Sequence, residues 1–259
     1  MFSETQLDAK NGTHISGDRF WEETQWPRTL HGEKILEAGC GMGRFSEIAL
    51  STGADLYSLD YSTAVDAARK NLKGNPKHCL VQASLYEMPF PKNHFDKIFC
   101  FGVLQHTPNV ERSFKSLAPY LKPGGSLVVD VYAAPISWFH PRQLFRPLTK
   151  RLSNKFLYRL VENAVPSLLA VSNAVAAIPK IGPILRHAVP VANYRGRYPL
   201  TKEQMREWAV LDTFDWFSPE YEKPQRKETI RRWFSEAGLT DIHVERNVGI
   251  YIARGTKSF

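Results

Sequence analysis

Three glycines at alternate positions, Gly39, Gly41 and Gly43, close a short apolar run at 34–38. Glycine lets the backbone approach a ligand where a Cβ would collide, and the helical periodicity that follows directs unpaired N–H groups toward the same point. A tight strand-to-helix turn would explain these glycines by themselves. Asp60, however, lies 21 residues beyond Gly39, at the end of the next apolar run, where a carboxylate can accept both hydroxyls of a ribose. The third glycine follows the second by two residues, whereas the dinucleotide-binding pattern requires three. The residues therefore predict a nucleoside site but do not match the dinucleotide-binding motif.

The elements that must position these residues alternate between strand and helix. The sequence predicts strands at 34–38, 55–60, 78–83, 95–101 and 126–132, followed by two closing strands at 239–246 and 248–253. It predicts helices after the glycines and at about 62–72, 109–121, 202–210 and 226–237, with Ser62 as an N-cap. This alternation is typical of a parallel, doubly wound sheet, which binds ligands at the carboxyl ends of its strands.

The alternation breaks at residue 133, where a proline-rich stretch with helical segments begins. We expect three parts: an N-terminal segment at 1–30 that is a candidate cap for the site, a cofactor-binding core at 31–132 and 226–259, and a helical insertion at 133–225 that forms a lid for the substrate. The apolar run at 164–178 is most simply a buried hairpin packed over the site.

The basic character of the chain is concentrated in this insertion. The formal net charge is +8, and residues 134–190 carry +7 of it, with Glu162 as their one acid. The stretch from Arg142 to Arg159 alternates Leu, Phe and Tyr with Arg and Lys. A solvated helix face, a site for an anionic substrate, contact with an anionic membrane and nucleic-acid binding are each compatible with this pattern.

Composition bounds the class of protein and its compartment. With 43% hydrophobic and 23% charged residues the chain is an ordinary globular protein and not a disordered one. Three widely spaced cysteines without a CxxC pair predict neither a disulfide framework nor a zinc site, and a reducing cytosol. The N-terminus is polar, which argues against a secretory signal. The longest charge-free run, 163–179, spans 17 residues and contains Pro166, so we expect no membrane span and a cytoplasmic protein whose membrane contact, if any, is peripheral.

Five segments in order resemble motifs of the class I S-adenosylmethionine-dependent methyltransferases. They are Ile35-Leu-Glu-Ala-Gly-Cys-Gly-Met-Gly-Arg-Phe45, Ser58-Leu-Asp-Tyr-Ser62, the segment from Val81 to Phe95, Phe101-Gly-Val-Leu-Gln-His-Thr-Pro108 and Leu121-Lys-Pro-Gly-Gly-Ser-Leu127. The chain is most similar to the ubiquinone/menaquinone-biosynthesis-like group, which methylates many small molecules. The resemblance covers about residues 30–133 and 226–254. It implies an α/β fold with a doubly wound, mostly parallel, seven-stranded Rossmann-like sheet and a helical insertion after strand five.

The resemblance also implies S-adenosyl-L-methionine as cofactor and S-adenosyl-L-homocysteine as product. Carried over position by position, it implies that Glu37 faces the methionine amino end, Asp60 holds the ribose and Tyr61 flanks the adenine. This family often has a carboxylate at the position of Ser84, so here Ser84 and the Leu85 backbone would contact the adenine amino group. The full implied set is Glu37, Gly39, Cys40, Gly41, Gly43, Asp60, Tyr61, Ser84, Leu85, Phe101, Gly102 and Gln105.

Catalysis needs a general base only if the acceptor must lose a proton, because methyl transfer from a sulfonium is an in-line displacement. His106 follows the fourth expected strand and could be that base, although a histidine that fixes the loop is the simpler interpretation. His140 at the start of the insertion is a further candidate, as are Tyr194, Tyr198, Asp212 and Asp215 near its end, although each is more simply a solvated or structural polar residue. No cluster of His, Asp and Glu predicts a metal site.

The sequence therefore predicts an S-adenosylmethionine-dependent methyltransferase with a small-molecule acceptor that is anionic or lipid-like and is chosen by the insertion. Two alternatives stay open: an RNA or protein methyltransferase with the same core, and a non-catalytic nucleoside-binding or membrane-associated scaffold. Phe101-Gly-Val-Leu104 stands where a base methyltransferase would carry an Asn-Pro-Pro-Tyr-type motif, which argues against nucleic acid. The intact glycine loop with Asp60 argues against the scaffold.

Overall fold

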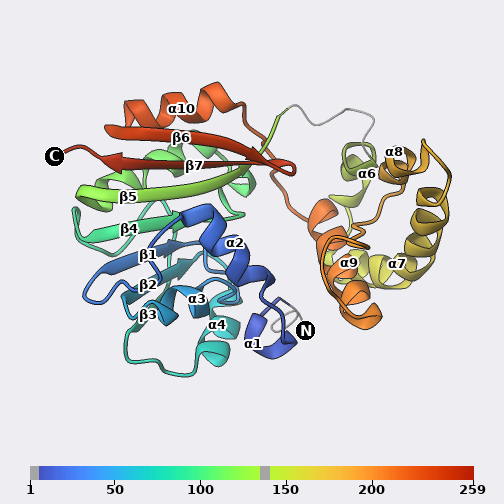
Figure 1. Cartoon of the computed structure of the whole chain (residues 1–259), viewed down its shortest axis with the longest axis horizontal. Helices are drawn as coiled ribbons and strands as arrows, with labels where there is room; N and C mark the ends of the chain where they lie inside the picture. The colour runs from blue at the N-terminus through green and yellow to red at the C-terminus, as the bar shows by residue number, and fades with distance from the viewer. Residues whose placement is uncertain (1–5, 135–140) are drawn as a thin grey trace. The chain divides into compact units, whose positions relative to one another are not determined.

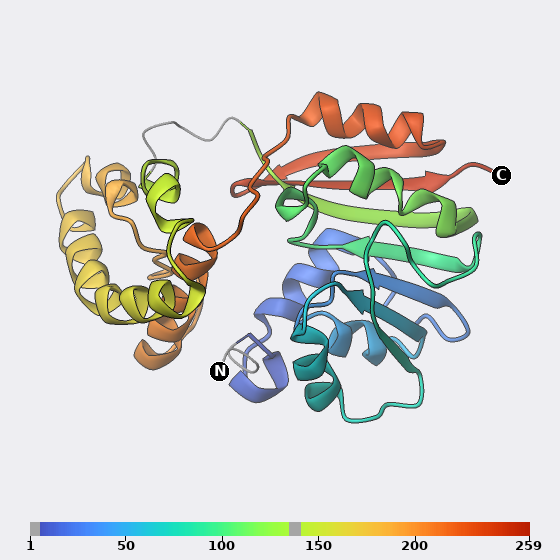
Figure 2. The same ribbon diagram turned by 180° about the vertical axis from the view of Figure 1, so that it is seen from behind.

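The computed structural model describes residues 6–134 and 141–259 (Figures 1 and 2). Contacts divide the described chain into two compact units. One, the sheet unit, comprises residues 6–134 and 221–259, and the other, the helical unit, comprises residues 141–220. Each unit has a hydrophobic core of its own.

A seven-stranded sheet forms the middle of the sheet unit, with the strand order β3-β2-β1-β4-β5-β7-β6. The strands are β1 (Lys34–Ala38), β2 (Asp55–Asp60), β3 (His78–Gln82), β4 (Phe95–Cys100), β5 (Leu121–Tyr132), β6 (Leu239–Asn247) and β7 (Ile250–Lys257). Strands β1 to β5 pair in parallel, and β7 runs antiparallel to both β5 and β6. The predicted doubly wound, mostly parallel sheet of seven strands is confirmed.

Short helices precede and connect these strands. In the sheet unit they are α1 (Asp8–Asn11), α2 (Ile15–Thr24), α3 (Ser46–Ser51), α4 (Ala64–Leu72), η1 (Leu104–His106), α5 (Val110–Lys115), η2 (Ala118–Tyr120) and α10 (Lys227–Glu236). The single helix predicted at 109–121 is instead α5 followed by the 3-10 turn η2. Pro119 has no N–H to continue the α-helical ladder at this point, so the chain tightens before it enters β5.

Successive residues of the central strands pack against opposite helical layers. Ile35 of β1 and Val128 of β5 join a cluster with Phe20 of α2 on one face of the sheet. Their neighbours Leu36 and Val129 join a second cluster, to which α5 and α10 contribute on the other face. Successive side chains of a strand point to opposite faces of the sheet, and both faces of a doubly wound sheet are buried. Neighbouring residues of these strands are therefore mostly apolar.

The helical unit contains α6 (Pro141–Thr149), α7 (Asn154–Ala176), α8 (Gly182–Leu185), η3 (Arg186–Ala188) and α9 (Lys202–Phe217). Leu157, Val161 and Val165 lie four residues apart on α7 and pack with Ala209 and Val210 of α9. The expected buried hairpin at 164–178 is wrong, because most of this run lies in α7, a continuous helix of 23 residues. The run is rich in Ala, which favours helix, and the regular buried stripe of α7 stabilises one long helix on α9.

Two of the eight basic residues between 134 and 190 are buried, Arg142 and Arg146. The Arg146 guanidinium donates to the carbonyl oxygens of Trp216 at 3.0 Å and Pro219 at 2.8 Å, at the end of α9. Carbonyls at a helix C-terminus lack intrahelical donors, so Arg146 satisfies them and ties α6 to α9. The guanidinium of Arg146 therefore has a structural role within the helical unit.

Candidate cofactor site

The residues that the resemblance assigns to the cofactor lie at the carboxyl ends of four neighbouring strands. The glycine loop 39–43 follows β1, Asp60 ends β2, Ser84 and Leu85 come after β3, and residues 101–105 come after β4. The strand order β3-β2-β1-β4 makes these segments adjacent along one edge of the sheet. The edge includes the place between β1 and β4 where the direction of winding reverses, which is where such sheets bind ligands.

Asp60 braces the glycine loop. Its Oδ2 accepts from the N–H of Gly41 at 2.8 Å, and its Oδ1 accepts from the N–H and the hydroxyl of Ser62 at 2.8 and 2.7 Å. Ser62 is predicted to cap α4, but the N-cap position falls on Thr63, whose side chain makes no cap hydrogen bond. The Ser62 hydroxyl oxygen still accepts from the N–H of Ala64, the first residue of α4, at 3.2 Å, while its O–H donates to the charged Asp60.

Gly39 and Gly41 have different surroundings. A Cβ at Gly39 would lie 2.3 Å from a methyl group of Val103, so packing against the loop after β4 requires glycine there. At Gly41, where φ is +53°, a Cβ would meet no atom of the described residues within 4 Å. Gly102 after β4 faces open space in the same way, with φ at +71°. Gly41 and Gly102 thus leave bare backbone at the edge of the sheet, as close approach by a ligand requires.

Glu37 is held by two serines. Its side chain is buried, and one carboxylate oxygen accepts from the hydroxyls of Ser46 and Ser58, the latter at 2.8 Å. Burial raises the pKa of Glu37 to about 7, although both hydroxyl donors act in the opposite direction. The carboxyl group is therefore close to half ionised at neutral pH.

Glu37 should make the protein less stable as the pH rises from about 4.5 to about 7. Between these values the unfolded carboxyl has lost its proton while the folded one retains it, so the free energy of unfolding falls and stays low above the folded pKa. The full loss is about 3 kcal/mol. Glu37→Gln keeps an oxygen acceptor and removes the titration. Chemical unfolding of both proteins across this pH range should show that the free energy of unfolding of the variant rises relative to that of the wild type as the pH rises. If the two free energies change in parallel, Glu37 is not the group responsible.

The other implied residues differ in exposure. Leu85, Phe101 and Cys40 are buried, and burial raises the pKa of the Cys40 thiol, which stays protonated. Tyr61 is 80% exposed, so its ring is available to a planar ligand. The Ser84 hydroxyl accepts from the backbone N–H of the residue two positions on, at 3.2 Å. Its contact with an adenine stays a prediction.

Gln105 carries an amide that the described protein does not satisfy. The side chain is fully buried in η1, and neither its nitrogen nor its oxygen has a hydrogen-bond partner among the residues described. A buried polar group without a partner costs about 1–3 kcal/mol. Its backbone is fixed, since its carbonyl accepts from the N–H of Lys223 at 2.9 Å. A bound ligand with polar atoms would remove this cost.

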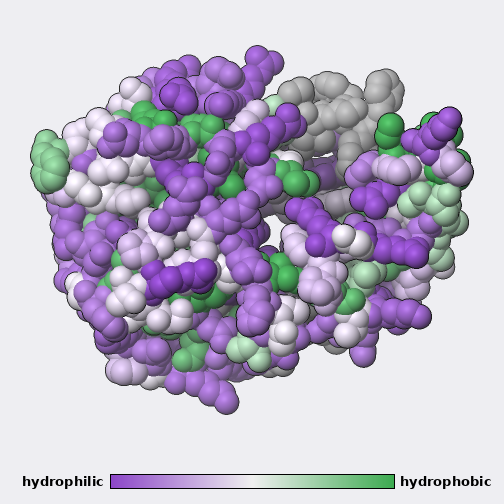
Figure 3. All heavy atoms as spheres, viewed as in Figure 1, coloured by the Kyte–Doolittle hydropathy of each residue, from purple (hydrophilic) through white to green (hydrophobic). Residues whose placement is uncertain are grey.

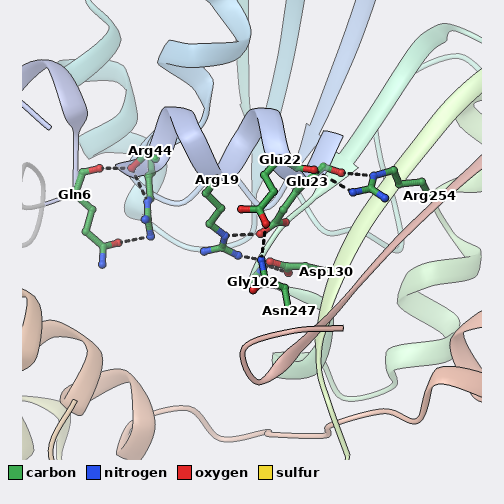
Figure 4. Close-up of polar contacts among 10 residues, drawn as sticks. Gln6, Arg19, Glu22, Glu23, Arg44, Gly102, Asp130, Asn247 and Arg254 are labelled. Carbon is green, nitrogen blue, oxygen red and sulfur yellow. Dashed lines mark hydrogen bonds and ion pairs between the residues drawn. The ribbon is translucent and has the colours of Figure 1, made fainter. Parts of the chain in front are cut away.

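Sequence reasoning missed a buried ionic network that joins α2 to this edge (Figure 4). Arg19 donates to Glu23 of its own helix at 2.6 Å and to Asp130 of β5, and Asp130 also accepts from the N–H of Gly102. Burial, followed by the charge of Asp130, raises the pKa of Glu23. The signal in the sequence was an acid inside the otherwise apolar run at 127–131, but its partner lies 111 residues away.

A second contact holds the N-terminal segment against the glycine loop. Arg44, directly after the loop, donates to the hydroxyl of Ser16 and to the side-chain oxygen of Gln6, both at 2.9 Å (Figure 4). Helix α2 is therefore attached to the edge of the sheet at two places, through Arg44 and through Asp130.

His106 fixes a loop of the sheet unit. Its Nδ1 lies 3.0 Å from the carbonyl oxygen of Tyr221. Because a carbonyl can only accept, Nδ1 carries the proton. The ring also packs edge-on against Tyr132. This geometry agrees with the simpler interpretation of His106, and the tautomer leaves Nε2 as the nitrogen able to take up a proton.

The remaining base candidates lie elsewhere. Tyr194 belongs to the helical unit, where its hydroxyl donates to Asp212. Burial and the Asp212 charge raise the pKa of Tyr194 well above its ordinary value, so this hydroxyl can donate a hydrogen bond but is a weak general base. Asp215 lies on α9, where desolvation and the negative charge of Asp212 raise the pKa of its carboxyl to about 7. His140 lies outside the described residues.

Known proteins share this domain. Residues 36–129 match the family model described as "Methyltransferase domain". The sterol 24-C-methyltransferase of Pneumocystis carinii is 27% identical over 179 residues, which cover 65% of this chain and 44% of that enzyme. A ubiquinone biosynthesis O-methyltransferase of Coxiella burnetii is 33% identical over 101 residues, or 38% of this chain and 43% of that one. The chain thus spans about half the length of the curated relatives it matches.

Solved structures share the fold. Phosphoethanolamine N-methyltransferase 2 of Haemonchus contortus, in complex with S-adenosyl-L-methionine, matches with a TM-score of 0.57 and 13% identity, over 100% of this chain and 56% of that one. An O-methyltransferase family protein from Burkholderia thailandensis matches with a TM-score of 0.56 and 13% identity, over 97% and 59%. At these identities the likeness shows the fold alone.

The strand order, the glycine loop braced by Asp60 and the matched domain define a class of protein, the S-adenosylmethionine-dependent methyltransferases of class I. Residues 36–129 of the chain match the methyltransferase domain of this class.

Proposed function

We propose that this chain transfers a methyl group from S-adenosyl-L-methionine to a small-molecule acceptor and releases S-adenosyl-L-homocysteine. The observation that carries the proposal is the braced and open glycine loop. Asp60 holds the Gly41 N–H at 2.8 Å, while the space beyond the Gly41 Cα is free of atoms of the described chain. A loop that is both rigid and accessible can hold a nucleoside without rearranging.

The residues at this edge fit the cofactor. A carboxylate has about four lone-pair sites, and three are used by Gly41 and Ser62, so the Asp60 Oδ2 can still accept from a ribose hydroxyl. The unsatisfied amide of Gln105 supplies a donor and an acceptor for the methionine portion. Bound S-adenosyl-L-methionine supplies an activated methyl group on a sulfonium, so the chain has chiefly to align the acceptor with it.

We assign the N-terminal segment to the cofactor as well, as a cap. Arg19 and Arg44 place two guanidinium groups beside the carboxyl ends of β1, β4 and β5. The Arg19 side chain is 30% exposed despite its two ion pairs, so it remains accessible to an anionic group such as a carboxylate.

Where the acceptor is a hydroxyl, its proton must leave. We assign that proton to His106 Nε2, because the Tyr221 carbonyl keeps the proton of the neutral ring on Nδ1.

We assign the choice of acceptor to the helical unit, since the polar groups of the sheet edge are taken up by the cofactor. A lipid-like acceptor suits this unit, whose surface is apolar and basic. Relatives named for a sterol and for ubiquinone biosynthesis support an apolar acceptor.

The purified protein should bind S-adenosyl-L-methionine and, given a cell extract, convert it to S-adenosyl-L-homocysteine. The experiment combines calorimetry with a screen in which methyl-labelled cofactor is incubated with separate lipid, polar-metabolite, RNA and protein fractions. Label in the lipid or metabolite fraction is the expected result. Label confined to RNA or protein would replace the proposed acceptor class. Binding without turnover in any fraction would identify a non-catalytic nucleoside-binding protein.

A further inference from the structure

Exposed apolar side chains are concentrated in the helical unit. Among the described residues, ten of the thirteen large apolar side chains that are exposed lie between Leu144 and Leu185. Ile184 is 74% exposed and Phe156 is 57% exposed. Figure 3 shows apolar residues in green over α7 and α8. Single apolar residues at a surface are ordinary, but a concentration of this size marks a binding surface.

Helix α7 contributes one side of this surface. Its buried residues pack with α9, whereas Phe156, Leu160 and Val171 are about half exposed. From Asn163 to Pro179 the sequence contains no charged residue, so the exposed side of α7 is uncharged over most of its length. A helix that faces water normally carries charged residues on that side. Helix α7 therefore presents an apolar side that its own unit does not cover.

Helix α8 extends the same surface. A Cβ at Gly182 would lie 2.4 Å from the carbonyl oxygen of Val175, so α8 sits directly on the last turn of α7. The side chains of Ile181 and Ile184 next to this contact are 53% and 74% exposed. We call the exposed side of α7 together with α8 the docking face, and its apolar members are Phe156, Leu160, Val171, Ile181 and Ile184.

Basic residues flank the docking face at both ends. Lys150, Arg151, Lys155 and Arg159 are exposed at the start of α7, and Lys180 is exposed before α8. Glu162, the one acid between 134 and 190, is engaged by the hydroxyl of Tyr158 at 3.1 Å. The residues that flank the docking face along the chain are thus mainly basic.

We propose that the docking face binds the surface of an anionic phospholipid bilayer. The apolar side chains would enter the boundary between headgroups and acyl chains, while Lys and Arg contact the lipid phosphates. A nucleic acid would account for the positive charge but would leave Ile184 and Phe156 in water. Among the described residues no helix is both long and apolar enough to cross a bilayer. This inference does not depend on methyl transfer.

Cosedimentation with vesicles tests the charged rim. Wild-type protein should bind phosphatidylcholine vesicles that contain phosphatidylglycerol, should not bind pure phosphatidylcholine, and should be released by salt. Lys155→Gln with Arg159→Gln should weaken binding about fivefold for each residue. The matched control is Lys227→Gln with Arg231→Gln, because these exposed residues have the same spacing on α10 of the sheet unit. The control should change binding less than about twofold.

A second pair of variants tests the apolar part. Ile184→Ser should weaken vesicle binding, whereas Val248→Ser, at a side chain 72% exposed in the sheet unit, should not. Circular dichroism and cofactor affinity should be unchanged in all four proteins, since the substituted side chains are exposed. Failure of the wild type to bind anionic vesicles overturns the inference even if the protein is an active methyltransferase. So does equal loss in test and control variants, or salt-sensitive binding to RNA without binding to vesicles.

Discussion

Replacing Gly41 by valine should abolish binding of S-adenosyl-L-methionine while the protein stays folded. A Cβ at this position meets no described atom within 4 Å, so the folded state bears only the strain of a branched residue at φ +53°, about 1–3 kcal/mol. The larger effect is on cofactor binding, because the valine side chain would occupy the space in which the cofactor is expected to lie. Calorimetric titration should show no binding, and thermal unfolding should remain cooperative with a lowered midpoint.

Two further glycine variants separate strain from obstruction. Gly74→Val imposes similar strain, with φ at +63° and open space around the Cβ, but lies between α4 and the amino end of β3, at the opposite edge of the sheet from the loop. It should lose stability and keep its affinity. Gly39→Ala should unfold or be severely destabilised, since its Cβ would overlap Val103. If Gly41→Val bound the cofactor with wild-type affinity, the loop would not touch the ligand.

The strands and the glycine loop could be predicted because their signals are local. Strands β1 and β2 begin and end where the apolar runs do, at Lys34–Ala38 and Asp55–Asp60. Most of their interior residues are apolar, and the two buried polar ones, Glu37 and Ser58, pair with each other, so the apolar runs still mark the bounds. The end of helix α9 is not evident from the sequence, which predicts a helix to Val210, whereas α9 continues to Phe217. Its last turns contain Thr213 and Asp215, which resemble a loop until tertiary packing holds them in a helix.

The polar interior could not be predicted, because its partners are distant in the chain. Arg19 and Asp130 meet across 111 residues, and nothing near either residue identifies the other. Arg142 and Arg146 stand in a run of cations that differ little in sequence, yet these two are buried while Lys155 and Arg159 are exposed. Arg146 is distinguished by the carbonyl oxygens at the end of α9, which no residue near it in the sequence reveals. The resemblance named Gln105, but its unsatisfied amide is visible only once the neighbours of η1 are known.

Asp60→Ala should weaken binding of S-adenosyl-L-methionine about ten- to hundredfold, which corresponds to about 1.5–3 kcal/mol for loss of a charged acceptor. The carboxylate also accepts from Gly41 and Ser62, so part of this loss would come from a loosened loop. Asp60→Asn keeps one oxygen acceptor for the loop and removes the charge. Its affinity for the cofactor should fall between those of the wild type and of Asp60→Ala. Calorimetry with the cofactor, beside thermal unfolding without it, separates the contributions.

The matched control for Asp60 is Asp55, because it is an acid of similar half-buried exposure at the other end of the same strand. Asp55→Ala lies at the amino edge of β2, where a doubly wound sheet binds no ligand, and should leave cofactor affinity within about twofold of wild type. The decisive comparison is Asp60→Asn against Asp55→Ala at equal thermal stability. Equal affinity in these two proteins would mean that Asp60 only braces the glycine loop and that the ribose is held elsewhere. A tenfold or larger difference would place the ribose on its free lone pair, at the carboxyl end of β2.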